Sequence, residues 1–165
     1  MRFEELQIPG KVLEGIKAAG FTECTPVQAL TLPRALIGKD IAAQAQTGTG
    51  KTAAFVLPIL NRLSHEKTAA RKVIKSLIIT PTRELAAQIE EAIHGYGRFL
   101  HVSTVAIYGG VSIKNQLNAL RHGVDIVVAT PGRLMDHIQR RSVDLRHIEV
   151  LVLDEDQSLE VRSEE

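Results

Sequence analysis

The chain has 165 residues, of which 44% are hydrophobic and 24% charged, and its formal net charge is +1. This length suits one compact domain, and the balanced composition excludes an intrinsically disordered chain. No stretch of about 18 apolar residues is free of charge, which excludes a membrane-spanning helix, and the single cysteine excludes an intramolecular disulfide. An acidic N-terminus without an apolar run predicts a cytoplasmic protein with no membrane partner.

Helical and strand patterns alternate along most of the chain. In chain order, the sequence predicts helices at 9–19 and 26–37, a weak strand at 40–45, a helix at 51–63, a strand at 76–80, a helix at 83–99, a strand at 104–108, a helix at 113–121, a strand at 125–130, a helix at 132–140 and a strand at 149–154. The last four strands are almost continuously apolar, as in strands buried on both faces. The pattern therefore predicts an α/β fold with a mostly parallel central sheet covered on both faces.

A phosphate-binding loop is expected where the weak strand at 40–45 ends. The segment Ala45-Gln46-Thr47-Gly48-Thr49-Gly50-Lys51-Thr52 fits the P-loop pattern, with alanine in place of the usual first glycine. Its glycines let successive backbone N–H groups converge on phosphate oxygens, and the helix that follows adds its positive N-terminal end. We expect Lys51 to reach the β- and γ-phosphates of a nucleotide and the Thr52 hydroxyl to ligate Mg²⁺.

Acidic residues end the strand at 149–154. Asp154 occupies the position of a Walker-B acid that holds Mg²⁺, and Glu155 is suited to polarise an attacking water as general base. The alternative is a strand that simply ends in solvated acids.

Further motifs give the chain a family resemblance. Gly20-Phe21-Thr22-Glu23-Cys24-Thr25-Pro26-Val27-Gln28 resembles a Q motif with Phe3 as its upstream aromatic, and 81–86, 109–110 and 130–133 resemble motifs Ia, GG and Ib. With the P-loop, these segments resemble the first RecA-like lobe of bacterial DEAD-box RNA helicases from Phe3 to about Glu155. The resemblance implies a three-layer RecA-like P-loop fold, ATP and Mg²⁺ as cofactors, and RNA-dependent ATP hydrolysis with RNA duplex remodelling in the full-length protein.

The resemblance also assigns roles to individual residues. Gln28 would contact the adenine edge through its amide, and Phe3 would stack on the ring or, alternatively, pack in the core. The expected track for the RNA sugar–phosphate backbone consists of Thr82, Arg83, Gly109, Gly110, Thr130 and Arg133. Such groups bind phosphates without reading sequence, although Thr82 and Thr130 are also natural helix caps.

Charged residues are unevenly distributed along the chain, and this distribution indicates which kind of partner it could bind. Residues 151–165 contain six acids and one base, so the 13 acids and 19 bases of residues 1–150 make that part about six charges positive. A basic excess suits a polyanion such as RNA, although it also fits an ordinary basic surface. The six histidines show no ligand spacing and are expected at the surface.

The C-terminal segment departs from the family pattern. The acidic motif reads Asp154-Glu155-Asp156-Gln157 rather than Asp-Glu-Ala-Asp, and the Ser-Ala-Thr motif and second lobe of the family do not follow. We therefore interpret 1–28 as a Q-motif region, 29–157 as the ATP-binding lobe and 158–165 as an atypical acidic tail without pattern. The tail would reflect a truncation, a frame disruption or a cloned fragment.

Two other functions remain open at this point. One is a catalytically silent nucleotide- or RNA-binding module, which the missing second lobe would explain. The other is a P-loop kinase or small GTPase, which is disfavoured because no Asn-Lys-x-Asp guanine-reading motif occurs. The chain alone is expected to bind nucleotide with weak or no unwinding.

Overall fold

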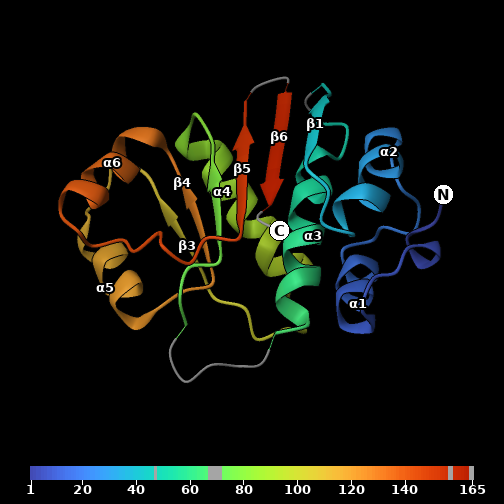
Figure 1. Cartoon of the computed structure of the whole chain (residues 1–165), viewed down its shortest axis with the longest axis horizontal. Coiled ribbons are helices and arrows are strands. Elements are labelled where there is room, and N and C mark those ends of the chain that lie inside the picture. Colours follow the sequence, from blue (N-terminus) through green and yellow to red (C-terminus); the bar gives the residue numbers. More distant parts are fainter. Residues whose placement is uncertain (47, 67–71, 156–157, 164–165) are drawn as a thin grey trace.

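The computed structural model describes residues 1–46, 48–66, 72–155 and 158–163. It has three layers, with a central sheet between two groups of helices (Figure 1). The elements are a short 3-10 helix η1 (Phe3–Glu5), α1 (Gly10–Ala18), α2 (Pro26–Ala35), β1 (Ile41–Gln44), α3 (Lys51–Ser64), β2 (Ser76–Ile79), α4 (Arg83–Tyr96), β3 (Thr104–Ile107), α5 (Lys114–His122), β4 (Ile126–Ala129), α6 (Pro131–Gln139), β5 (Val150–Asp154) and β6 (Ser158–Ser163).

The sheet has the strand order β1-β6-β5-β2-β4-β3. Strands β3, β4, β2 and β5 run parallel, whereas β6 is antiparallel to both of its neighbours, β5 and β1. Two reversals leave β1 pointing in the same direction as β5, so the carboxyl ends of β1 to β5 meet at one edge. The expected α/β fold with a mostly parallel sheet is confirmed, and this edge is where such folds bind ligands.

Each face of the sheet has its own apolar core because side chains alternate along the strands. On one face Ile126 and Val128 of β4 pack with residues of α1, α2, α3 and α4. On the other face Val127 and Ala129 of the same strand pack with Leu134 of α6 and with partly buried residues of α5. All four β4 residues are fully buried, which explains why this segment is apolar without alternation.

Strand β6 differs from the expected unpatterned tail. Residues 158–163 fold back from β5 and fill the space between β5 and β1 (Figure 1). Val161 is buried in the core, and Ser163 donates through its backbone N–H to Asp40 Oδ1 at 2.8 Å and through its hydroxyl to the Gly38 carbonyl at 2.8 Å. The tail prediction was therefore wrong for these residues, while the unusual Asp156-Gln157 pair lies outside the described residues.

Within the described ranges, no helix combines the length and the apolar character needed to cross a bilayer.

Candidate functional site

The predicted phosphate loop, acidic motif and backbone-binding motifs all follow strands at the same edge of the sheet. The loop follows β1, Asp154 ends β5, and the segments at 81–86, 108–111 and 130–133 follow β2, β3 and β4. Parallel strand direction thus gathers residues that are more than 100 positions apart, such as Lys51 and Glu155.

The phosphate loop adopts the backbone that its glycines were expected to supply. Gly48 and Gly50 have φ angles of +85° and +84°, which residues with a Cβ rarely adopt. Gly50 caps α3, whose first residue is Lys51, so the positive end of this helix opens onto the loop. The Thr49 hydroxyl donates to the Gln46 carbonyl at 2.6 Å, and Thr47 lies outside the described residues.

The loop lysine contacts the acidic motif. Lys51 Nζ lies 3.1 Å from Asp154 Oδ1 and donates to the Glu155 carbonyl oxygen at 2.8 Å. The Lys51 and Asp154 side chains are only 11% and 6% exposed, so solvent screens this ion pair poorly. A buried cation and carboxylate beside a helix N-terminus form a polar centre that can exchange partners with phosphate oxygens and a divalent cation.

Gln28 connects the Q-motif segment to the phosphate loop. Its Oε1 accepts from the Thr25 backbone N–H and its Nε2 donates to the Gly50 carbonyl, both at 3.0 Å. Thr25 in turn accepts from the Gln28 backbone N–H, which completes a capping box at the start of α2. A primary amide has two donor hydrogens and two acceptor lone pairs, so each end of Gln28 retains capacity for an adenine edge.

A cavity of about 450 Å³ joins these residues, a size suited to a small ligand. Its lining consists of Phe21, Thr25, Gln28, Gly48, Gly50, Lys51, Thr52, Leu85, Gln88, Tyr96, Asp154 and Glu155. Ala45, Gln46 and Thr49 instead line a neighbouring cavity of about 660 Å³ between α2 and β1. The structure thus brings together Gln28, Lys51, Thr52, Asp154 and Glu155.

Five lining residues were not among the predicted site residues: Phe21, Thr25, Leu85, Gln88 and Tyr96. Phe21 and Tyr96 form a tilted aromatic pair with ring centroids 6.3 Å apart, and the Phe21 side chain is 47% exposed. Burial raises the pKa of Tyr96. Thr25 could have been found from the Thr-x-x-Gln spacing of a capping box, but the contribution of α4 depends on tertiary packing.

Phe3 does not reach this cavity. It is 2% exposed and belongs to the apolar core with Val12 and Ile16. Its ring therefore offers no open face to an adenine in this structure, which favours packing in the core over stacking.

The residues of the expected RNA track lie on three adjacent loops. A Cβ added to Gly110, whose φ is +80°, would lie 2.8 Å from Arg83 Nη1, so the guanidinium after β2 lies against the loop after β3. Arg133 also reaches this loop, since its Nη2 donates to the Val111 carbonyl at 3.1 Å. Thr82 caps α4 by accepting from the Leu85 N–H at 3.2 Å.

The remaining track residues complete the surface. Gly109 has open space where a side chain would be, and Thr130 donates weakly to the Ile107 carbonyl at 3.5 Å instead of capping α6. The track therefore presents two guanidinium groups and an uncovered loop at the sheet edge.

One histidine contradicts the expectation that all six lie at the surface. His137 is fully buried, whereas the other five are exposed. Its ring lies between Gln116 and Ser142, within hydrogen-bond distance of both side chains. In the described ranges, no three histidine, cysteine, aspartate or glutamate residues cluster as a metal site would require.

Comparison with known proteins agrees with this geometry. A family model described as "DEAD/DEAH box helicase" matches residues 25–165. The chain belongs to this family. Among similar DEAD-box helicases, the ATP-dependent RNA helicase CshA of Streptococcus pneumoniae serotype 4 is 49% identical over 94% of the chain and 29% of the relative. The helicases named CshA from Limosilactobacillus reuteri and Bacillus cereus are 48% and 46% identical, over 94% and 93% of the chain and 30% and 28% of the relatives. The chain thus spans less than a third of these helicases.

Proposed function

We propose that this chain is the ATP-binding lobe of an ATP-dependent RNA helicase that works in the cytoplasm. The main support for this proposal is the ion pair between Lys51 Nζ and Asp154 Oδ1, which are 3.1 Å apart. Both residues line one cavity, beside a glycine-rich loop and the N-terminus of α3. RNA-dependent ATP hydrolysis and duplex remodelling are proposed for the whole protein, because the relatives that bear the helicase name are more than three times as long.

ATP fits the cavity with its phosphates at Gly48, Gly50 and Lys51. The backbone N–H groups and the ammonium group neutralise phosphate charge where little solvent competes. The free capacity of Gln28 matches the N6–H donor and N7 acceptor of adenine. Phe21 and Tyr96 give the same cavity an aromatic wall.

The residues present also fit Mg²⁺. Thr52 and Asp154 line the same cavity and supply a hydroxyl and a carboxylate oxygen, which are ligands that Mg²⁺ prefers. When bound, this ion neutralises charge on the β- and γ-phosphates. Glu155, which lines the same cavity, would polarise the water that attacks the γ-phosphate, with its carboxylate accepting the water proton. Lys51 exchanges its contact with Asp154 for the phosphate oxygens.

RNA is proposed to lie along Arg83, Gly109, Gly110, Thr130 and Arg133, with Thr82 orienting the start of α4. The guanidinium groups contact phosphates, and the uncovered glycine loop allows the sugar–phosphate backbone to approach closely. Because these contacts do not read bases, binding should be independent of sequence and should weaken as salt concentration rises.

Isothermal titration calorimetry tests the nucleotide site. We expect Mg·ATP to bind more tightly than Mg·GTP, and EDTA to weaken ATP binding. Equal affinity for both nucleotides would contradict the proposed adenine contact of Gln28. The absence of any heat of binding would contradict the proposed nucleotide site.

The second candidate is a silent nucleotide- or RNA-binding module. The contact of Lys51 Nζ with the Glu155 backbone carbonyl favours it, because this contact engages the lysine with the protein itself. Comparing RNA-stimulated ATP hydrolysis of this chain with that of a chain of the relatives' length distinguishes the two. Hydrolysis only in the longer chain supports the helicase lobe, and hydrolysis in neither supports the silent module.

A further inference from the structure

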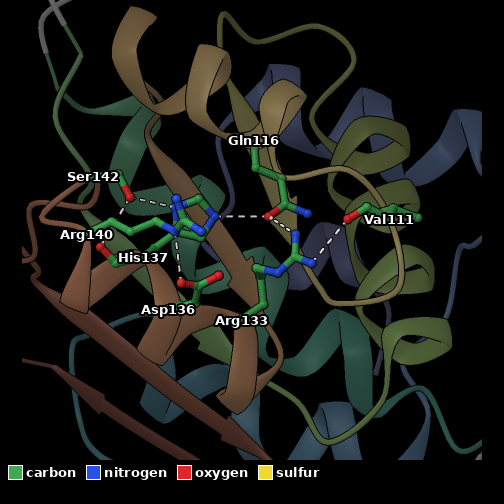
Figure 2. A network of polar contacts seen from close by, with 7 residues as sticks. All are labelled: Val111, Gln116, Arg133, Asp136, His137, Arg140 and Ser142. Carbon is green, nitrogen blue, oxygen red and sulfur yellow. Dashed lines mark hydrogen bonds and ion pairs between the residues drawn. The ribbon is translucent and has the colours of Figure 1, made fainter.

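Gln116 is a buried polar residue of α5 that contacts three residues of two other segments. It is 5% exposed. Its Oε1 accepts from Arg133 Nη1 at 3.1 Å and from His137 Nε2 at 3.0 Å (Figure 2). Its Nε2 donates to the Tyr108 carbonyl at 3.0 Å. One side chain thus joins α5 to the loop after β3 and to two positions of α6.

The hydrogen-bond partners fix the proton positions in this cluster. The Tyr108 carbonyl can only accept, so the amide nitrogen of Gln116 faces it and Oε1 faces Arg133 and His137. His137 must therefore carry a proton on Nε2, while its Nδ1 lies 2.7 Å from the Ser142 hydroxyl oxygen, which is also 3.2 Å from the His137 carbonyl oxygen. Burial lowers the pKa of His137, with Arg133 and Arg140 acting in the same direction and Asp136 opposing them.

Gln116 and Arg133 together hold both ends of the loop from Tyr108 to Val111. Gln116 binds the Tyr108 carbonyl, and Arg133 Nη2 binds the Val111 carbonyl at 3.1 Å. Because Arg133 Nη1 binds Gln116, its planar guanidinium is fixed at two nitrogens, and rotation about its Nε–Cζ bond would break both contacts.

We propose that Gln116 is a positioning residue for RNA binding: it aims the Arg133 guanidinium and fixes the Gly109-Gly110 loop without touching RNA itself. This inference rests on the proposed RNA contact of Arg133. Only an amide fits the place, because the position needs an acceptor for two donors and a donor for one carbonyl. Glutamate would keep the acceptor but meet the Tyr108 carbonyl with a second acceptor.

NMR of the arginine side chain tests the positioning step without RNA. In the parent chain the Nη protons of Arg133 should give resolved signals, because two fixed contacts slow rotation. Gln116→Ala should merge them, whereas Gln116→Glu, which keeps the acceptor, should leave them resolved. Asn118→Ala, at an exposed position of α5, is the matched control and should change nothing. Resolved Arg133 signals in folded Gln116→Ala would overturn the proposal.

RNA binding tests the functional step, using fluorescence anisotropy of a labelled single-stranded oligouridine. Arg133→Ala and Gln116→Ala should each weaken binding about tenfold, as expected for one charge-assisted contact. Each should also lower the slope of log affinity against log salt by about one. If Gln116 acts largely through Arg133, the loss of binding free energy in the double variant should be smaller than the sum of the two single losses.

The outcomes separate this inference from the proposed function. Additive losses in the double variant, or an unchanged affinity of Gln116→Ala when Arg133→Ala is weakened, would overturn the positioning role. If the parent chain binds no oligouridine but Gln116→Ala still merges the Arg133 signals, RNA binding fails while the aiming of Arg133 by Gln116 stands. Should Gln116→Ala fail to fold, Gln116→Glu decides: resolved Arg133 signals together with weaker RNA binding, caused by the lost contact to the Tyr108 carbonyl, would support the proposal, whereas lost Arg133 signals or an unchanged affinity would overturn it.

Discussion

Replacement of Gln28 by alanine distinguishes a base-reading role from a role in holding the phosphate loop. The structure shows the second role directly, because Gln28 Nε2 donates to the Gly50 carbonyl at 3.0 Å. Gln28→Ala should therefore weaken the binding of every nucleoside triphosphate to some extent. If the amide also reads adenine, the loss should be larger for ATP.

The expected magnitudes follow from the contacts that disappear. The Gln28 side chain makes two hydrogen bonds: its Oε1 accepts from the Thr25 N–H, and its Nε2 donates to the Gly50 carbonyl. Each contributes about 1 kcal/mol to stability. The free energy of unfolding should thus fall by about 2 kcal/mol. Loosening the loop should lower the affinity for all triphosphates about tenfold, and loss of two adenine contacts should lower the affinity for ATP about 30-fold more.

Calorimetry of Mg·ATP and Mg·CTP, together with urea denaturation, measures both components. Gln139→Ala, at an exposed position of α6, is the matched glutamine control and should leave all three values unchanged. Equal losses for ATP and CTP would show that Gln28 holds the loop but does not read the base. Unchanged stability together with unchanged affinity for both nucleotides would refute the reasoning from the capping box and the Gly50 contact.

Three further predictions concern other parts of the molecule. Lys51→Ala should weaken Mg·ATP binding about 100-fold or more in calorimetry, because the phosphates then face backbone dipoles without the ammonium group; an unchanged Kd would count against the cradle. Val161→Asp places a charge at a position that is 6% exposed, so urea denaturation should show a loss of about 3 kcal/mol or more; a loss below about 0.5 kcal/mol would disprove the role of β6 in the core. The pKa of His137 is lowered in the folded chain, mainly by burial, so its stabilising contribution is complete above about pH 6.5 and is lost as the pH falls below that value. When the pH is lowered from about 7.5 to about 5, urea denaturation should show a larger fall in the free energy of unfolding for the parent chain than for His137→Gln. An equal fall in both chains would contradict this prediction.

The strands and the phosphate loop could be predicted because their signals are local. Val127 and Val128 lie in an apolar run that only a doubly covered strand explains, and Gly48 and Gly50 have the spacing that the loop backbone requires. The strand at 158–163 was missed, although Leu159 and Val161 alternate with polar residues as in a strand with one buried face. Acidic composition concealed that alternation.

The Gln116–His137 cluster and the position of Phe3 were beyond sequence reasoning for a different reason. The role of Gln116 could not be read from the sequence, because its side-chain partners Arg133 and His137 lie 17 and 21 residues away and reach it only through the packing of α6 on α5. The direction of the Phe3 ring depends on how η1 packs on α1, which is a tertiary contact. Local sequence motifs identify residues whose side chains could bind a ligand, and tertiary packing decides which of them line the cavity.

The pairing of β1 has a consequence for how the chain matures. In the described structure β1 hydrogen-bonds only with β6, and Asp40 contacts Ser163 across 123 positions of sequence. Closing a loop of this length is slow. On the ribosome, β1, which precedes the proposed nucleotide site, emerges early but stays without its neighbour β6 until residue 163 has left the exit tunnel. Capture of ATP is therefore expected to be a late event in biogenesis, after the rest of the sheet has formed.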